Sequence, residues 1–182
     1  MGVFFALLPE DPAREELAAF ERPTIDGVRW EPPERLHVTI RYFASIPAEL
    51  LGSTIDAGCA CAADRSPPTI DLGPATERLG RDGTLVVPAS GAAPLAAALD
   101  TALDGAGLTG VLESRAESFY GHLTLARQRR EVTIPNGAMA RPLATSFVAR
   151  ELVLIDSVST PDGRRYEVLA RAPFLASGEA LS

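Results

Sequence analysis

The sequence contains no lysine, and all 17 basic residues among its 182 are arginines. This absence excludes reactions that need a lysine amine, such as Schiff-base or lysyl-adenylate formation, and phosphate binding by a P-loop lysine. The sequence also lacks a G-x-S-x-G segment, so nothing supports an ordinary serine hydrolase. No apolar run approaches the roughly 18 residues that span a membrane, and the N-terminal VFFALL is too short for a signal peptide. We therefore expect a cytoplasmic protein.

Cysteine and histidine are scarce, with two of each. Cys59 and Cys61 are separated by one residue, which is closer than the spacing of most structural zinc sites. Two small buried thiols on a helix are the simpler interpretation, and a zinc site drawing on both histidines is the alternative. The net charge of −7 argues against wrapping long nucleic acid. It still allows a few arginines to bind one phosphate or a nucleic-acid end.

The spacing of apolar residues and of proline and glycine predicts a chain of the α+β class. Helices are expected at 12–20, 47–64 and 91–104, and strands at 3–8, 36–43, 69–72, 84–87, 119–127, 146–157 and 164–174. Segments 3–43 and 84–127 share the order strand, helix, strand. Two such units, related by an approximate two-fold axis, predict one bilobal domain over residues 1–182. Antiparallel-rich sheets would face each other across a central cleft, with the helices outside.

Each of the two histidines begins a His-x-Thr segment on an expected strand. In LHVTIRYF (36–43) apolar and polar residues alternate, so that His37, Thr39 and Arg41 share the open face of the strand. The HLTL segment at 122–125 repeats the pattern with His122 and Thr124. The two-fold arrangement would bring both pairs into one cleft.

Two histidines that face each other can perform paired acid–base catalysis near neutral pH. Threonine hydroxyls beside them can donate hydrogen bonds to phosphoryl oxygens, and an arginine can stabilise the developing charge. This chemistry needs no metal and no cofactor, and the sequence has no carboxylate cluster to hold a metal. A strained cyclic phosphodiester is a suitable substrate.

Several neighbouring residues allow two interpretations. Arg41 has the parity of the cleft face but could equally be a salt-bridge partner, while Tyr42 and Phe43 are expected in the core. Tyr120 has the cleft parity and could stack on a base. Trp30 could pack between the lobes or stack on a base.

Three segments carry a family resemblance: VRWEPPERLHVTIRYF, GHLTLAR and LVLIDSVSTPDGRRYEVLARAPF. They resemble the two-histidine phosphoesterases, and most of all the bacterial and archaeal RNA 2′,3′-cyclic phosphodiesterases, long called 2′-5′ RNA ligases. The resemblance runs from about Val3 to Phe174. One departure is Gly121, which stands where members often have proline.

The resemblance implies that water opens a 2′,3′-cyclic phosphate to a 2′-phosphomonoester, with weak reversible 2′-5′ joining of RNA ends. It implies that His37 donates a proton, that His122 accepts one, and that Thr39 and Thr124 bind the phosphoryl group. Arg127 recurs in the second motif as a phosphate-binding residue. Strict alternation, however, puts it on the face opposite His122 unless a β-bulge turns it.

The expected partners are RNA 3′ ends or small cyclic-phosphate nucleotides, with no membrane, and the chain is expected to act as a monomer. ADP-ribose 1″,2″-cyclic phosphate and 2′-5′-linked oligoadenylate are alternative substrates that the sequence does not separate. A non-catalytic module that binds RNA ends is the alternative of another class. It would bind cyclic-phosphate ends without turnover, and it would have no need of two titratable histidines.

Overall fold

A computed structural model describes residues 2–80, 83–110, 112, 118–128, 139–160 and 163–175 of the chain. The helices are α1 (Ala13–Ala19), α2 (Ala48–Ala63) and α3 (Ala93–Gly105), with a 3₁₀ turn η1 (Pro33–Arg35). The strands are β1 (Gly2–Leu7), β2 (Val28–Trp30), β3 (Val38–Phe43), β4 (Thr69–Leu72), β5 (Glu77–Leu79), β6 (Thr84–Ser90), β7 (His122–Gln128), β8 (Thr145–Val148), β9 (Glu151–Thr160) and β10 (Gly163–Pro173).

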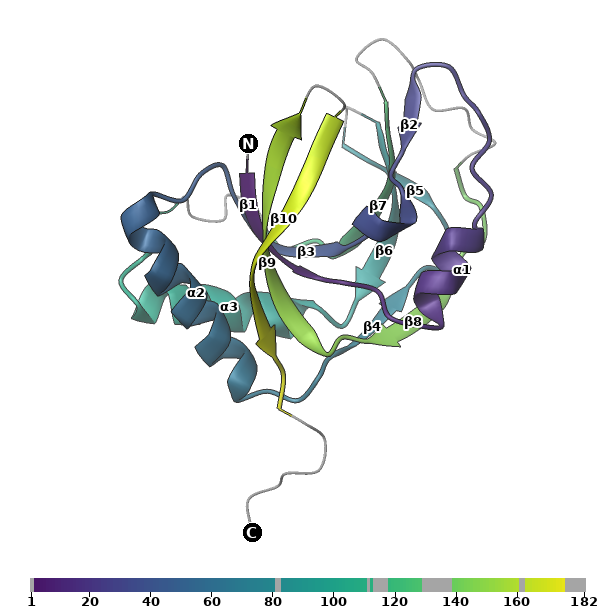
Figure 1. The fold of residues 1–182 in the computed structure, drawn as a ribbon. Helices are drawn as coiled ribbons and strands as arrows, with labels where there is room; N and C mark the ends of the chain where they lie inside the picture. Colours follow the sequence, from purple (N-terminus) through teal and green to yellow (C-terminus); the bar gives the residue numbers. More distant parts are fainter. Residues whose placement is uncertain are drawn as a thin grey trace.

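The strands form one curled antiparallel sheet in the order β10-β9-β1-β3-β7-β6-β4-β8, with β2 added beside β7 and β5 beside β6 (Figure 1). The order is symmetric about the junction of β3 and β7, because β1 flanks one and β6 flanks the other. The prediction of an antiparallel-rich α+β fold is confirmed. It differs in one respect: β3 and β7 lie side by side, with Val38 paired to Leu123, and do not face each other across a groove.

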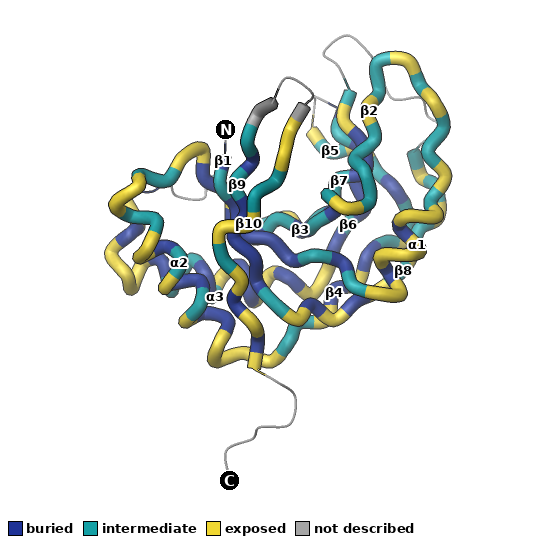
Figure 2. The backbone as a smooth tube through the Cα atoms, in the orientation of Figure 1, coloured by how far each residue is buried: buried dark blue, intermediate teal, exposed yellow. Residues whose placement is uncertain are grey.

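Helices α2 and α3 pack against each other and against the sheet, α2 on β9 and β10 and α3 on β3. In α3, Leu95, Leu99 and Leu103 recur at helical spacing and are buried. Figure 2 shows that the buried stretches run through the central strands and the inward sides of these helices. Helix α1 lies at the far side, near β8 and η1, and Arg22 caps its carboxyl end by donating to the carbonyls of Leu17 and Ala18.

The strand expected at 146–157 is two strands. Ala149, between β8 and β9, is buried and its amide donates to the carbonyl of Pro68. Strand β8 then pairs with β4, whereas β9 pairs with β1, so the chain changes its partner at this point. The strands β2 and β5 have three residues each, too few to show the alternation of a strand, and the sequence did not predict them. The TPDG segment at 160–163, whose sequence favours a turn, and the short basic segment RQRR at 127–130 lie partly outside the described residues.

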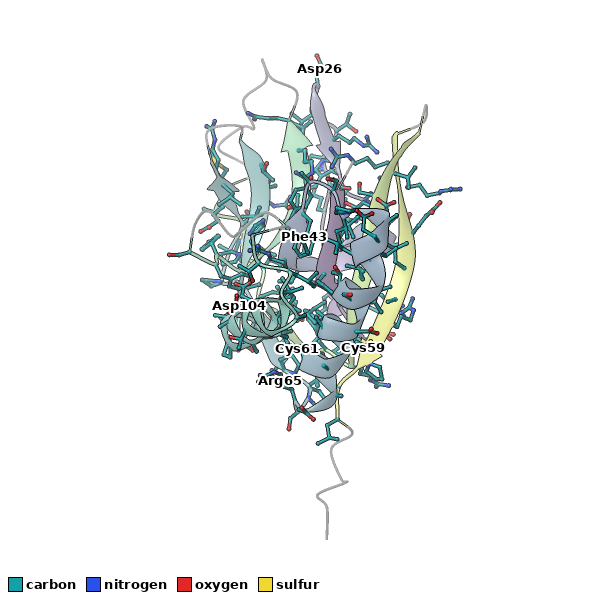
Figure 3. All side chains as sticks on the ribbon, turned by 90° about the vertical axis from the view of Figure 1, so that its left-hand side faces the viewer. Asp26, Phe43, Cys59, Cys61, Arg65 and Asp104 are labelled. Carbon is teal, nitrogen blue, oxygen red and sulfur yellow. The ribbon has the colours of Figure 1, made fainter. Side chains whose placement is uncertain are left out.

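Both cysteines lie on α2, and Asp26 lies at the opposite end of the molecule (Figure 3). Cys61 is buried and Cys59 is half-buried, as expected for small thiols on a helix. Within the described ranges, no three His, Cys, Asp or Glu side chains are grouped so that they could hold a metal ion. None of the described helices combines the length and the apolar character that a membrane crossing requires.

Candidate active site

The two His-x-Thr segments lie at the centre of the sheet, on adjoining strands. Because Val38 pairs with Leu123 in antiparallel register, His37 is aligned with Thr124 and Thr39 with His122. Side chains alternate along a strand, so these four polar groups share the face opposite the buried Val38 and Leu123. The fold therefore brings together the four residues that the sequence singled out.

Both histidines are held in the same way. The Nδ1 atom of His37 lies 2.7 Å from the carbonyl oxygen of Arg35, and the Nδ1 atom of His122 lies 2.9 Å from that of Tyr120. A carbonyl oxygen only accepts hydrogen bonds, so each Nδ1 carries a proton. In the neutral imidazole this leaves the lone pair on Nε2. Each Nε2 can then accept a proton or, once protonated, donate one.

Two aromatic rings pack against His37. The ring of Phe4 stacks on it with centroids 4.8 Å apart, and the edge of Tyr166 approaches within 5.5 Å. Burial is the main cause that lowers the pKa of His37, and the positive charge of Arg127 lowers it further. The carbonyl of Arg35 and the carboxylate of Glu31 act in the opposite direction without reversing the shift.

Strand β3 contains a β-bulge immediately after its His-x-Thr segment. Thr39 pairs with Ala6 and Arg41 pairs with the neighbouring Phe5, so Ile40 is an extra residue in β3. The extra residue reverses the alternation that follows it. Arg41 is consequently buried on the helix side of the sheet, with 7% of its surface exposed.

The prediction that Arg41 shares the cleft face is therefore wrong. Its Nη1 atom lies 3.6 Å from the Oδ1 atom of Asp100 on α3, and it lines a different cavity together with Phe43. The salt-bridge alternative describes it better. The same reversal turns Tyr42, which was expected in the core, out onto the cleft face, where 54% of its surface is exposed.

Strand β7 has a β-bulge at the corresponding place. Thr124 pairs with Val86 and Ala126 with the neighbouring Leu85, which leaves Leu125 as the extra residue. Arg127 therefore comes onto the cleft face, and its Nε atom lies 3.1 Å from the Oε1 atom of Glu31. Each strand thus reads His-x-Thr, then a bulge, then a cleft side chain three residues after the threonine. That side chain is Tyr42 in the first half and Arg127 in the second.

A small cavity of about 90 Å³ lies on the His37 side of the cleft, and neither His122 nor Thr124 lines it. Its lining residues are Gly2, Phe4, His37, Thr39, Tyr42, Arg127, Ser157, Arg164 and Tyr166. Sequence reasoning missed the cleft residues of β1, β9 and β10, because these strands carry no His-x-Thr motif and only the folded sheet brings them beside β3. For Tyr42 the signal was available, since its distance from Thr39 equals that of Arg127 from Thr124.

Two further residues can now be placed. The ring of Tyr120 stacks on that of His122 at a centroid distance of 5.9 Å, and its hydroxyl donates to Glu77, which raises the pKa of Tyr120 to about 12. It is half exposed, so stacking on a base stays a prediction. Trp30 donates to the carbonyl of Pro23 and packs near Phe20, in agreement with the packing interpretation.

Gly121 is closely confined by β6. A Cβ atom on it would lie 2.2 Å from the carbonyl oxygen of Ala89. That oxygen belongs to the backbone, so a larger residue requires the backbone beside His122 to move.

No protein-family model and no curated protein sequence matches the chain. Solved structures do match. TT0787 of Thermus thermophilus is 24% identical, with a TM-score of 0.79 over 96% of this chain and 98% of that one. A phosphoesterase structure is 23% identical, with a TM-score of 0.69 over 95% of this chain and 97% of the other. E. coli LigT complexed with 3′-AMP is 23% identical, with a TM-score of 0.72 over 94% of this chain and 97% of that one.

The chain has the same fold as these proteins, one of which is a phosphoesterase. The resemblance found in the sequence is thus confirmed for the architecture along nearly the whole chain. In this fold the symmetric strand order explains why the two His-x-Thr motifs, which begin 85 residues apart at His37 and His122, lie on adjoining strands.

Proposed function

We propose that the protein hydrolyses RNA 2′,3′-cyclic phosphate ends to 2′-phosphomonoesters by two-histidine acid–base catalysis, without a metal ion. The observation that carries the proposal is the symmetric pair of His-x-Thr segments on β3 and β7. Each histidine has its Nδ1 proton held by a carbonyl oxygen two residues before it. Two such groups on one face can accept a proton from one oxygen and give a proton to another.

The proposed reaction is a single in-line displacement at phosphorus. His122 Nε2 accepts a proton from water, the water oxygen forms a bond to phosphorus, and the bond between phosphorus and O3′ breaks. His37, in its protonated form, gives its proton to O3′. The products are a 2′-phosphate and a free 3′-hydroxyl, and the enzyme regains its starting state after one proton exchange between the histidines and solvent.

The lowered pKa of His37 has two opposing effects on the part of proton donor, the first being that less of the histidine is protonated at neutral pH. The second is that the imidazolium form, which burial and Arg127 disfavour, is a stronger acid and gives up its proton to the leaving oxygen more readily. Thr39 and Thr124 lie beside the histidines and are proposed to donate hydrogen bonds to the non-bridging oxygens. Arg127, turned onto the same face by its bulge, adds a fixed positive charge.

The fold neighbours support a nucleotide as the ligand. E. coli LigT, whose structure matches this chain over almost its full length, was crystallised with 3′-AMP. A nucleoside monophosphate resembles the product of the proposed reaction in size and in charge. A weak reverse reaction that joins RNA ends through a 2′-5′ linkage is part of the proposal.

The proposal is tested by incubating the protein in EDTA with a short RNA that ends in a 2′,3′-cyclic phosphate. We expect a 2′-phosphate end to accumulate and no 3′-phosphate to form. Arg171→Gln, which changes a surface arginine that is paired with Glu151, serves as the control and should give the wild-type rate. If only metal restores activity, or if the product is a 3′-phosphate, the proposed reaction is wrong. If cyclic ends bind tightly without turnover, the protein is a binding module.

A further inference from the structure

A second cavity lies beside the cleft and is lined by residues of β2, β7, η1 and the start of β10. Its volume is about 560 Å³, much larger than that of the cavity beside His37. Its arginines are Arg29, Arg35, Arg127 and Arg164. Its carboxylates are Asp26 and Glu31. In a chain with a net charge of −7, this cavity concentrates positive charge.

Two of these arginines are direct cross-strand neighbours. In the pairing of β2 with β7, Arg29 stands opposite Arg127, so both side chains lie on the same face of the sheet. Like charges in directly opposite positions destabilise a sheet. An anion bound between the two arginines would remove this repulsion.

The carboxylates of the cavity do not balance its arginines. Glu31 forms ion pairs with two arginines. Its Oε1 atom lies 3.1 Å from the Nε atom of Arg127, and its Oε2 atom lies 3.9 Å from the Nε atom of Arg35. Among the residues that the structure describes, no carboxylate lies within ion-pair distance of the side chain of Arg29 or Arg164.

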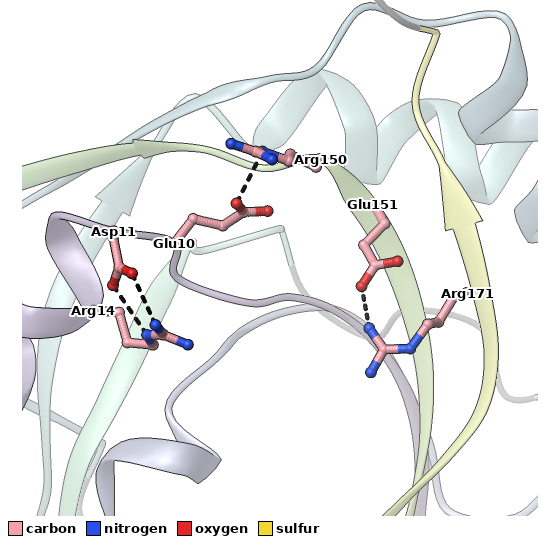
Figure 4. A network of polar contacts seen from close by, with 6 residues as sticks. All are labelled: Glu10, Asp11, Arg14, Arg150, Glu151 and Arg171. Atoms are coloured by element: carbon pink, nitrogen blue, oxygen red, sulfur yellow. Dashed lines mark hydrogen bonds and ion pairs between the residues drawn. The ribbon is translucent and has the colours of Figure 1, made fainter.

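Several described surface arginines elsewhere each pair with a carboxylate of their own. Figure 4 shows three of them, each with its own carboxylate. The pairs are Arg14 with Asp11, Arg150 with Glu10, and Arg171 with Glu151. The sharing of one glutamate in the cavity therefore departs from the pattern of these surface pairs.

The cavity adjoins the cleft. Arg127 and Arg164 line both, and the Nη1 atom of Arg35 donates to the carbonyl oxygen of Arg164 at 2.7 Å. That bond ties η1, just before His37, to β10. Guanidinium groups are well suited to phosphate, because their planar fork offers two parallel N–H donors to its oxygens.

We propose that this arginine cavity binds a second phosphate of the substrate, the one on the 5′ oxygen of the nucleoside whose cyclic phosphate reacts. The inference rests on the proposed function, which puts the cyclic phosphate between the two histidines. A nucleotide held there has its next phosphate on the 5′ oxygen. That phosphate is a monoester in a mononucleotide and a diester within an RNA chain, and the cavity recognises what the two have in common.

The kinetic test compares three substrates with the same base. They are uridine 2′,3′-cyclic phosphate, the same compound with a 5′-phosphate, and the dinucleotide UpU that ends in a cyclic phosphate. A charge-assisted contact to phosphate is worth about 1.5–3 kcal/mol, so the 5′-phosphate or diester should raise kcat/KM by about 10- to 100-fold. In Arg29→Gln the ratio between substrates with and without the 5′ group should fall towards one. Arg171→Gln is the matched control and should keep the wild-type ratio.

A binding test does not depend on turnover. It measures the dissociation constants of uridine 2′-phosphate and uridine 2′,5′-bisphosphate for wild type, Arg29→Gln and Arg171→Gln. We expect the 5′-phosphate to tighten binding by the same factor of about 10 to 100 in wild type and in Arg171→Gln. Arg29→Gln should lose most of this gain.

The outcomes of these tests distinguish the claim about the arginine cavity from the claim about the reaction. A 5′ gain in binding that Arg29→Gln abolishes, without hydrolysis of any substrate, supports the cavity and overturns the proposed reaction. Hydrolysis of all three substrates at equal kcat/KM, with no effect of Arg29→Gln on the ratios, overturns the cavity and leaves the reaction standing. A gain with the diester alone means that the cavity takes an RNA chain, and a gain with both means that it also takes mononucleotides.

Discussion

At the scale of single residues, the chemistry of the cleft depends on how His37 is surrounded. The ring lies against Phe4 and Tyr166, and the charges of Arg127 and Glu31 also act on it. Burial and the arginine disfavour the imidazolium form, so the pKa of His37 is lowered. The protonation state of this histidine is thus set by neighbours that come from distant parts of the chain.

Arg127→Gln should raise the pKa of His37, because it removes a positive charge that opposes protonation and leaves Glu31 without its closest partner. Proton NMR titration of the imidazole rings measures this directly, since the chain has only two histidines and a His122→Asn spectrum assigns the signals. In a pH profile of kcat/KM, the limb that reports His37 should move to higher pH. An unchanged or lowered pKa in Arg127→Gln, with Arg171→Gln as the control, would contradict this electrostatic account.

Composition and motif alone singled out four residues of the candidate site, and the structure places them on one face of adjoining strands. His37, Thr39, His122 and Thr124 stood out because the chain has two histidines and each begins the same three-residue pattern on a strand-like run. The cleft residues of β1, β9 and β10 could not be found in this way. Their presence depends on these strands being arranged around β3, which no local pattern encodes.

At the scale of the strands, one extra residue decides which face the later side chains reach. Ile40 in β3 and Leu125 in β7 are the residues that the partner strands leave unpaired. Strict alternation therefore predicts the wrong face for Arg41, Tyr42 and Arg127, although it is right for the histidines and threonines before them. A bulge has no sequence signature as strong as alternation itself, so only pairing with the neighbouring strand reveals it.

Arg41→Gln should affect stability and leave catalysis unchanged, because Arg41 lies on the helix side with Asp100. Loss of this largely buried charged contact should lower the free energy of unfolding by about 1–3 kcal/mol. Arg14→Gln, which breaks the exposed pair with Asp11, is the matched control and should cost less than about 1 kcal/mol. Urea unfolding and kcat/KM together check the prediction. A large loss of kcat/KM in a stably folded Arg41→Gln protein would put the arginine back in the cleft.

At the scale of the whole molecule, the two halves are joined by the central pairing of β3 with β7 and by one continuous core. The main core cluster includes residues of both halves, such as Val38, Leu85 and Leu123, together with α2 and α3. The alternating and helical periods predicted most elements of this architecture. The adjacency of β3 and β7 was not predicted, since register between distant strands is fixed by packing and not by the local pattern.

We expect the chain to unfold as one cooperative unit. Leu123→Ala removes a fully buried side chain at the junction, and should lower the free energy of unfolding by about 2–5 kcal/mol. Within each protein, the fluorescence of Trp30, the single tryptophan, and far-UV circular dichroism should report the same urea midpoint. The midpoint of the variant should be lower than that of wild type. Two separate transitions would mean that the halves are stable independently.

The most direct test of the central claim is to measure kcat/KM on a 2′,3′-cyclic phosphate end for His37→Ala, His122→Ala and the double variant, in EDTA. Each single substitution should lower the rate by about 10²–10⁴-fold while circular dichroism confirms a folded chain. Because the two histidines transfer protons in one step, the double variant should be little worse than the poorer single variant. A single variant that keeps the wild-type rate, or losses that simply multiply in the double variant, would contradict paired catalysis by the two histidines.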